Sequence, residues 1–392
     1  MRPLDGITVL TLEHAVAAPF ATRQLADLGA RVIKIERPGQ GDFARGYDAR
    51  VKGLSSYFAW INRSKESLTL DLKHPEAAPI LAQLVAKSDV LIQNLSPGAA
   101  ARLGLSAQAL RPQHPGLIVC DISGYGANGP YARKKAYDIM IQAESGLLSV
   151  TGTEDQPSRT GFSAADVSAG MYAFTSILSA LILRMRTGKG SHIDLAMLES
   201  LGEWMTNPLY YAFDGAPPPV RAGASHPSIY PYGPFKTGDG KIVMLGIQNE
   251  REWALFCQRV LQQPDLATHP DYDSNIKRHG KRDALRALIE QAFATLTSED
   301  VQKRLDDATI GNAQMNTMHD VWAHPQLKAR DRWREVGSPA GPIPALLPPG
   351  INDQFDYRMD PIPALGEHTD AILHELGYDD DRIASLRNAG AL

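Results

Sequence analysis

The sequence has 392 residues, 43% of them hydrophobic and 21% charged, which is typical of a globular protein that buries a large core. Its 40 lysine and arginine residues against 44 acidic residues give a formal net charge of −4 without a basic tail, which argues against a nucleic-acid partner. No apolar signal region follows Met1, and the most apolar run, 171–183, is too short to span a bilayer. Cys120 and Cys257 lie in apolar stretches, so we expect buried, reduced thiols, no membrane partner and a cytoplasmic location.

The predicted elements begin with a β-rich run at 7–12, a helix at 19–28 that Gly29 ends, and a strand at 31–35. This order predicts an α/β fold with a doubly wound, mostly parallel sheet. Later segments with the patterns of strands are 68–72, 89–92, 116–122, 191–196 and 242–246. Later segments with the patterns of helices are 75–88, 168–186, 197–204 and a pair within 369–390.

The composition changes at Ala216, where three prolines predict a linker. We therefore assign residues 1–215 to a large Rossmann-like α/β domain and 216–330 to a smaller α/β domain with its preceding linker. A second region rich in proline and glycine, 337–350, begins the return of the chain. We assign 331–392 to that linker and to a C-terminal segment that packs on the large domain.

Asp166 lies among small residues at the start of the long apolar helix. Unpaired backbone N–H groups and the positive end of the helix dipole are expected to keep this carboxylate ionised. An accessible, ionised aspartate can act as a covalent nucleophile. The alternative is a helix cap without any catalytic role, since aspartate is common there.

Two other site classes are not supported by the sequence. Gly124, Gly126 and Gly129 match the spacing of a dinucleotide-binding loop, but Pro130 follows where a helix is required, so we exclude a nicotinamide cofactor. The sequence has no HExxH or CxxC motif, so we predict no metal site.

Several segments together resemble the class III CoA-transferases, the family of formyl-CoA and carnitine CoA-transferases. They are 3–42, 122–131, 135–138, 163–170, 186–194 and 365–370. The resemblance implies an interlocked homodimer, with an acyl-CoA and a small carboxylic acid as substrates and no prosthetic group. It also implies that Asp166 forms first a mixed anhydride and then an aspartyl-CoA thioester.

The resemblance carries further site residues onto this sequence. Those implied to bind CoA are Arg37, Leu70, Lys73, Asn94, Arg102, Lys135, Tyr137 and Asp138. Those implied to face the acyl group or the acid are His14, Val16, Ala17, Arg45, His226, Gly246 and Gln248. Arg45 and His14 are candidates to bind a remote carboxylate.

Two departures from the formyl-CoA type bear on the substrate. Val16 replaces a glutamine, which disfavours formyl and oxalyl groups, and 246–249 is not a run of glycines. The segment 221–235 resembles the branch that uses succinyl-CoA with itaconate, mesaconate or citramalate.

Tyr137 discriminates between transfer and racemisation. The α-methylacyl-CoA racemases of the same superfamily have a histidine here as a second acid–base group, and a phenol is a poor base at neutral pH. A CoA-transferase is therefore favoured, with a racemase or isomerase, a CoA hydrolase and a non-catalytic CoA-binding protein as alternatives.

Overall fold

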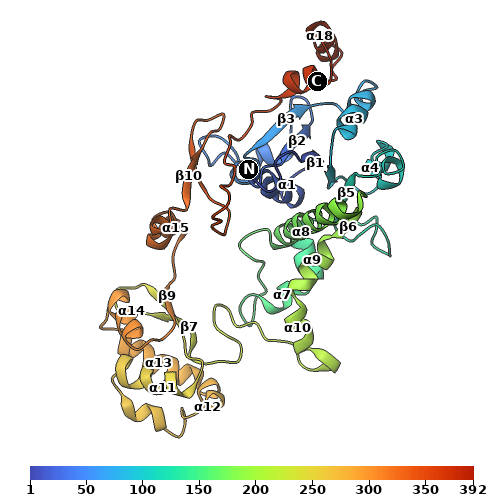
Figure 1. The fold of residues 1–392 in the computed structure, drawn as a ribbon. Coiled ribbons are helices and arrows are strands. Elements are labelled where there is room, and N and C mark those ends of the chain that lie inside the picture. The colour runs from blue at the N-terminus through green and yellow to red at the C-terminus, as the bar shows by residue number, and fades with distance from the viewer. The chain divides into compact units, whose positions relative to one another are not determined.

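The computed structural model describes residues 1–392, which form two compact units (Figure 1). The first unit contains Met1–Gly146, Thr160–Asn207 and Ala329–Leu392, and the second contains Leu147–Arg159 and Pro208–Lys328. The sequence-based division differs mainly in placing 147–159 with the large domain. This segment belongs to the second unit because Gly223 N–H donates to the Gly152 carbonyl at 2.8 Å and Arg221 donates to the Thr153 carbonyl at 2.8 Å.

A six-stranded sheet forms the centre of the first unit, with every pair of neighbouring strands parallel and the order β3-β2-β1-β4-β5-β6. Its strands are β1 (Thr8–Leu12), β2 (Arg31–Glu36), β3 (Lys65–Thr69), β4 (Val90–Gln93), β5 (Ile118–Ser123) and β6 (His192–Ala196). The predicted α/β fold with a parallel sheet is confirmed. β3 begins and ends three residues earlier than predicted, and at Asp71 the backbone N–H already donates to the Ala391 carbonyl.

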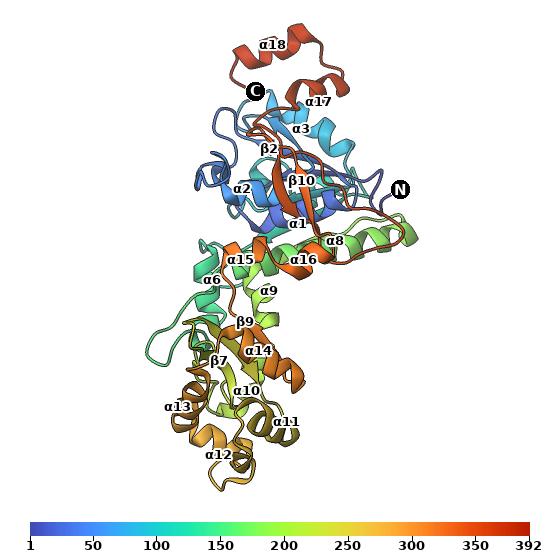
Figure 2. The ribbon, with the colours of Figure 1, turned by 90° about the vertical axis from the view of Figure 1, so that its left-hand side faces the viewer.

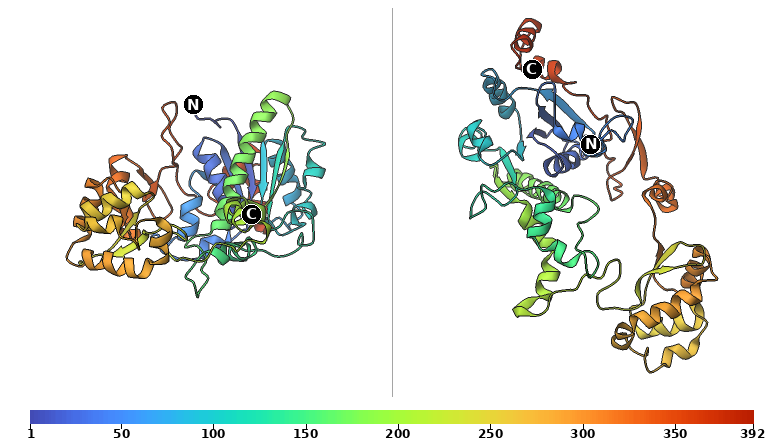
Figure 3. Two further views of the ribbon diagram at one scale, coloured as in Figure 1. Left: turned by 90° about the horizontal axis from the view of Figure 1, so that it is seen from below. Right: turned by 180° about the vertical axis from the view of Figure 1, so that it is seen from behind.

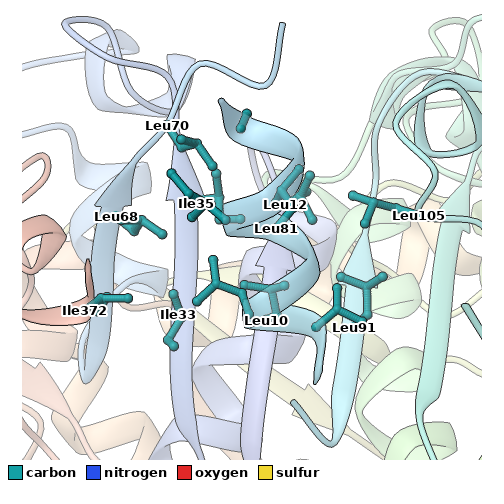
Figure 4. Close-up of a cluster of buried hydrophobic side chains, with 14 of the residues drawn as sticks. Leu10, Leu12, Ile33, Ile35, Leu68, Leu70, Leu81, Leu91, Leu105 and Ile372 are labelled. Atoms are coloured by element: carbon teal, nitrogen blue, oxygen red, sulfur yellow. The ribbon is translucent and has the colours of Figure 1, made fainter. Parts of the chain in front are cut away.

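The two faces of this sheet are covered differently. On one face, Leu10 and Leu12 of β1 and Ile33 of β2 pack against Leu81 of α3 (Ala77–Ala86) (Figure 4). The C-terminal helices α17 (Thr369–Glu375) and α18 (Asp380–Asn388) join the same cluster (Figure 2). On the other face lie the polar side chains of β1 and β2, beneath α1 (Ala17–Asp27).

The remaining elements of the first unit are short. The helices are η1 (Phe43–Gly46), α2 (Ser56–Ile61), α4 (Ala99–Arg102), α5 (Ala107–Leu110), α6 (Asp138–Glu144) and α9 (Met197–Trp204). β10 (Trp333–Val336) and β11 (Ile343–Leu346) form an antiparallel pair that packs on Phe58. Cys120 is buried in this unit and Cys257 in the second, and both are free thiols, as predicted.

The long helix α8 (Ala164–Thr187) packs against α1, α6, α9, β5 and β6. α8 is longer than the apolar run 171–183 and could cross a bilayer by length and composition alone. A core helix passes the same test, and the packing on five neighbours makes α8 a core helix here. Its C-terminal half nevertheless leaves Ile182, Leu183 and Met185 exposed.

The second unit contains a three-stranded antiparallel sheet in the order β7-β8-β9 and the helices that cover it (Figure 3, right). The strands are β7 (Tyr232–Lys236), β8 (Ile242–Gly246) and β9 (Asn312–Gln314). The helices and helical turns are α7 (Leu147–Val150), α11 (Glu250–Leu255), η3 (Phe256–Val260), η4 (Pro264–Thr268), α12 (Asn275–Gly280), α13 (Arg282–Phe293), α14 (Ser298–Asp307) and α15 (Met318–Trp322). Helices α10 (Thr206–Tyr211) and α16 (Pro325–Ala329) lie at its boundaries, and η2 (Phe213–Gly215) follows α10.

Gly170 lets α8 approach α1 closely. A β-carbon built at Gly170 would lie 2.7 Å from the Ala17 carbonyl oxygen and 2.9 Å from the Phe20 ring. We expect Gly170→Ala to lower the free energy of unfolding by about 1–3 kcal/mol, because backbone cannot yield as a side chain can. Gly202→Ala is the matched control in helix α9, where nothing lies within 4 Å, and should stabilise by about 0.5–1 kcal/mol. Thermal unfolding of the two variants tests this, and equal effects would contradict the close packing.

Candidate active site

A cavity of about 1290 Å³ lies in the first unit, where the carboxyl ends of β1 to β5 meet. Its lining comes from the segments 14–17, 35–37, 70–73, 94–97 and 122–124, each at the end of one of these strands. β1 and β4 are neighbours at the point where the strand order reverses. In doubly wound sheets this crevice is the usual place for a ligand.

Four basic residues line the cavity without a carboxylate partner in the chain: Arg37, Lys73, Arg102 and Lys135. All four are exposed at their outer ends. Arg37, Lys73 and Lys135 lie in loops after β2, β3 and β5, and Arg102 ends the short helix α4, which follows β4. Free cations in this arrangement can bind the phosphates of one extended ligand.

The neighbouring lysines 134 and 135 have different surroundings. Lys134 forms an ion pair with Glu144, and its ammonium lies 4.2 Å from the centre of the Tyr131 ring. Lys135 has no such partner. The structure therefore leaves Lys135 available to a ligand, in agreement with the residue that the sequence singles out.

Asp166 lines the cavity from the first turn of α8. The expectation that this helix start keeps Asp166 ionised is wrong, because another carboxylate uses the N–H groups. Asp138 Oδ1 accepts from the backbone N–H of Ala165 at 2.8 Å and of Asp166 at 3.2 Å. The next N–H group, that of Val167, donates to the Ser163 carbonyl. Asp138 therefore caps α8, and its side chain is a structural partner of Asp166.

The pKa of Asp166 is raised to about 7 by burial and, secondly, by the negative charge of Asp138. A carboxyl with such a pKa binds a proton more strongly than an ordinary aspartate does. Near neutral pH it titrates between a neutral and a reactive form, which is typical of groups in active sites.

The turn after β1 is held from two sides. The amide of Asn94 accepts from His14 N–H at 2.9 Å and donates to the His14 carbonyl at 2.9 Å. Asp42 Oδ1 accepts from Ala15 N–H at 3.1 Å, and Ala15 has the left-handed backbone angle φ of 60°. Asn94 was expected to bind CoA. It lines the cavity, but both polar atoms of its amide are used to fix the turn.

Beneath this turn lies a buried ionic network. Lys65 Nζ donates to Glu13 Oε1 at 2.7 Å, and Lys34 Nζ donates to Asp42 Oδ2 at 2.7 Å and to Asn62 Oδ1 at 3.1 Å. These five residues are at most 2% exposed. Burial by itself would raise the pKa of Glu13, but Lys65 and Lys34 lower it to about 2, so Glu13 is ionised. Burial lowers the pKa of Lys65 to about 7, although the charge of Glu13 opposes this.

Arg45 was expected to bind a remote carboxylate, and the structure contradicts this role. Its guanidinium donates to both carboxylate oxygens of Glu36, at 2.8 and 2.7 Å, and lies 3.7 Å from the centre of the Phe58 ring. Arg45 is not among the residues that line the cavity. Its charge is already neutralised, so it stabilises the loop after β2.

Aromatic side chains that the sequence analysis missed form part of the cavity wall. Phe43, Tyr47 and Tyr57 line it together with Tyr137, and the rings of Tyr47 and Tyr57 meet edge to face at 5.3 Å. Burial and, secondly, Asp42 raise the pKa of Tyr47 to about 12, so its hydroxyl remains a hydrogen-bond donor. The sequence signal was the run of aromatic residues between 43 and 60, to which no motif drew attention. Leu70, which the resemblance assigns to CoA, and Val16 and Ala17, which it assigns to the substrate, also line the cavity, and these roles stay predictions.

His226, Gly246 and Gln248 belong to the second unit. The His226 ring stacks on Tyr232 with centres 5.3 Å apart, and its Nδ1 accepts from Ile229 N–H at 3.0 Å. Gly246 ends β8, and Gln248 N–H donates to Glu252 at 2.7 Å. Their roles in a substrate site stay predictions.

The raised pKa of Asp166 has a cost in stability that depends on pH. Between about pH 4 and 7 the folded protein keeps a proton that the unfolded chain has released, so stability falls as the pH rises. We expect Asp166→Asn to be more stable than the unaltered protein at pH 8, by about 1–3 kcal/mol, and equally stable near pH 4.5. Thermal unfolding across this range measures it. The exposed loop residue Asp353 provides the control Asp353→Asn, and equal behaviour of the two variants would refute the shift.

Comparison with known proteins identifies the family. The model of CoA-transferase family III matches residues 4–369. The human protein "Succinyl-CoA:glutarate CoA-transferase" is 34% identical over 400 residues, covering 100% of this chain and 90% of the relative. "Acetyl-CoA:oxalate CoA-transferase" of Acetobacter aceti is 39% identical over 294 residues, which cover 74% of this chain and 75% of the relative. "Succinyl-CoA:mesaconate CoA-transferase" of Haloarcula marismortui is 31% identical, with 97% and 98% covered.

A solved structure supports the same assignment. The crystal structure of a CAIB/BAIF family protein from Brucella suis superimposes with a TM-score of 0.87 at 35% identity, and covers 96% of this chain and 99% of that protein. The α/β fold with its large parallel sheet is thus shared with a family structure. With its family model, its relatives and its fold in agreement, the chain belongs to CoA-transferase family III and is an enzyme of the CoA-transferring class.

Proposed function

We propose that the protein transfers CoA from succinyl-CoA to a small dicarboxylic acid, with Asp166 as the covalent nucleophile. The observation that carries this proposal is the position of Asp166 in one cavity with the four free cations Arg37, Lys73, Arg102 and Lys135. A CoA molecule needs cations for its phosphates and a nucleophile at its thioester, and this cavity provides both.

The proposed reaction exchanges acyl bonds in four balanced steps. The Asp166 carboxylate attacks the thioester carbonyl, the C–S bond breaks, and a mixed anhydride and CoA thiolate result. The thiolate attacks the Asp166 carbonyl of the anhydride, which releases the donor acid and leaves an aspartyl-CoA thioester. The acceptor carboxylate then attacks this thioester, the C–S bond breaks, and a second mixed anhydride and CoA thiolate result. The thiolate attacks the acceptor carbonyl of this anhydride, the C–O bond breaks, and the acceptor acyl-CoA and the free Asp166 carboxylate are formed.

Backbone groups support the negative charge that develops in these steps. Val16 and Ala17 lie at the start of α1 and line the cavity. Their backbone N–H groups donate no hydrogen bond to any residue of the chain. Such N–H groups can stabilise an oxyanion. This assigns the role to α1, since the start of α8 is already capped by Asp138.

The relatives support a dicarboxylic acid as acceptor. Glutarate, mesaconate and oxalate, which their names contain, each carry two carboxylates. We propose an acceptor of five carbons, such as glutarate, itaconate, mesaconate or citramalate. Val16 disfavours oxalate, whereas the identity with the oxalate enzyme of Acetobacter favours it, so oxalate belongs among the acids to be assayed.

Racemisation is the second candidate, and the cavity argues against it. Moving an α-proton needs a base and an acid on opposite sides of the substrate. At the position where the racemases have a histidine, the cavity has Tyr137, a phenol, followed by Asp138, whose carboxylate caps α8. A phenol is in general a poor base at neutral pH. The histidine that does line the cavity, His14, is assigned below to the acceptor acid.

Intact-mass spectrometry after incubation with succinyl-CoA tests the mechanism. We expect an adduct of the mass of CoA that hydroxylamine removes and that maps to Asp166. Its rate of formation should rise with pH through about 7, because only the ionised carboxylate attacks. Asp166→Asn should form no adduct, and Asp353→Asn should form it as the unaltered protein does. α-Proton exchange in heavy water, without an adduct from any acyl-CoA, would instead establish a racemase.

We also propose that the enzyme is a homodimer, interlocked as the family resemblance implies. Each unit has exposed apolar side chains: Ile182, Leu183 and Met185 in the first, and Leu209 with Phe213 in the second. Exposed apolar groups of this kind are typical of surfaces that a partner covers. Sedimentation at micromolar concentration should give twice the chain mass of 42.7 kDa. A species of 42.7 kDa would contradict the dimer.

A further inference from the structure

We propose that His14 binds the remote carboxylate of the acceptor acid and takes up a proton as it does so. The inference rests on the proposed dicarboxylate function and goes beyond it, because it assigns a recognition residue and a proton linkage. Four observations carry it. The His14 ring is held in place, and its Nδ1 atom has no hydrogen-bond partner. The charged residues beneath the ring are paired with one another, and Arg45, the other candidate to bind the remote carboxylate, is paired with Glu36.

The His14 ring is held in place. Asn94 bonds both backbone groups of His14 at 2.9 Å, and the next residue, Ala15, is tied to Asp42. The ring stacks on Phe43 with centres 5.2 Å apart and an angle of 22° between the planes. A ring held in this way presents a defined edge to a ligand, with little rotational freedom left to lose on binding.

One nitrogen of this ring is buried without a partner. Nδ1 accepts and donates no hydrogen bond, although it lies 4.0 Å from Asp42 Oδ1, which is too far for such a bond. The side chain is 30% exposed and lines the cavity. Since Nδ1 is buried, the exposed part is the other edge of the ring, which carries Nε2. A ring protonated on both nitrogens could face Asp42 with one and a ligand anion with the other.

The charges around His14 keep it neutral until an anion arrives. Burial lowers its pKa, and the cations Lys34 and Arg37 lower it further, whereas Asp42 and Glu13 oppose this. Below the ring, Lys34 and Lys65 pair with Glu13 and Asp42, and Arg45 pairs with Glu36. Arg37 also acts on His14 and has no carboxylate partner, but the proposed function assigns it to the phosphates of CoA. Protonation of His14 is therefore the means by which this part of the cavity can supply a positive charge to a second carboxylate.

A His14 ring that is neutral in the absence of ligand also favours acids with two carboxylates over acids with one. An acid with one carboxylate uses that group at Asp166 and brings no anion to His14. An acid with two carboxylates brings the second, and the charge-assisted hydrogen bond to an imidazolium is stronger than a neutral one. The proposed recognition therefore favours dicarboxylic acids and draws a proton from solvent for each one bound.

Calorimetry on the Asp166→Asn protein saturated with CoA tests this without turnover and without titration of Asp166. Glutarate and pentanoate are the matched probes, since both have five carbons and only glutarate has a second carboxylate. Titrations at pH 7 in buffers with different heats of ionisation give the number of protons taken up. We expect uptake of up to one proton for glutarate, none for pentanoate, and glutarate affinity that falls as the pH rises from 6 to 8.5.

Adding His14→Gln should abolish the proton uptake and weaken glutarate about tenfold or more, and leave pentanoate unchanged. His114→Gln, at a histidine outside the cavity, is the control and should change neither. Glutarate that does not bind, binds without proton uptake, or takes up the same proton after His14→Gln overturns the inference. If His14→Gln does not fold, pH-independent glutarate affinity in the parent protein overturns it equally.

The outcome is separable from that of the proposed function. An Asp166 adduct in the otherwise unaltered protein, with no effect of His14, leaves the transferase mechanism standing and removes only this inference. Proton uptake that depends on His14, in a protein that forms no adduct with any acyl-CoA, removes the mechanism and keeps the carboxylate site.

Discussion

The buried carboxylate of Glu13 connects the elements on which the site depends. It accepts hydrogen bonds from Lys65 of β3, from Thr11 of β1 and from Thr22 of α1, and Lys34 of β2 lies 3.4 Å away. A buried ion pair is weak evidence for stability, because removing two charges from water is costly. The contacts of Glu13 are geometrically specific, however. They fix the strands β1, β2 and β3 and the helix α1 relative to one another at the point where the chain leaves β1.

From that point two further carboxylates shape the chemistry. Asp42 holds the turn after β1, and Asp138 caps the helix that carries Asp166. The cap explains why Asp166, the proposed nucleophile, lies beside a like charge, a costly arrangement that a protein tolerates at a functional site. The fold and the ionisation of Asp166 are thus coupled through Asp138. Its carboxylate accepts hydrogen bonds from the first N–H groups of α8, and its negative charge raises the pKa of Asp166.

Much of the fold could be predicted from the sequence, because it depends on local patterns. The β1–α1–β2 unit and the start of the long helix follow from hydrophobic periodicity and glycine stops, and they place Asp166 correctly. The ionisation of Asp166 was missed because its partner, Asp138, lies 28 residues earlier in the chain. Arg45 was misassigned for the same kind of reason, because no sequence pattern indicates that its guanidinium forms an ion pair with Glu36. Phe43, Tyr47 and Tyr57 were missed because they contribute to the wall from the segment 43–57, which contains η1 and the start of α2 and has no motif.

The contact between Gly170 and the Ala17 carbonyl has a consequence for precision. α8 carries Asp166, and α1 begins with the free N–H groups of Val16 and Ala17, so this contact sets the spacing between the proposed nucleophile and those donors. Backbone atoms have no rotamers, and a distance that they define does not fluctuate as side chains change conformation. If Asp166 is the nucleophile, the distance between it and these donors is therefore fixed by backbone packing and does not depend on the side chains that line the cavity.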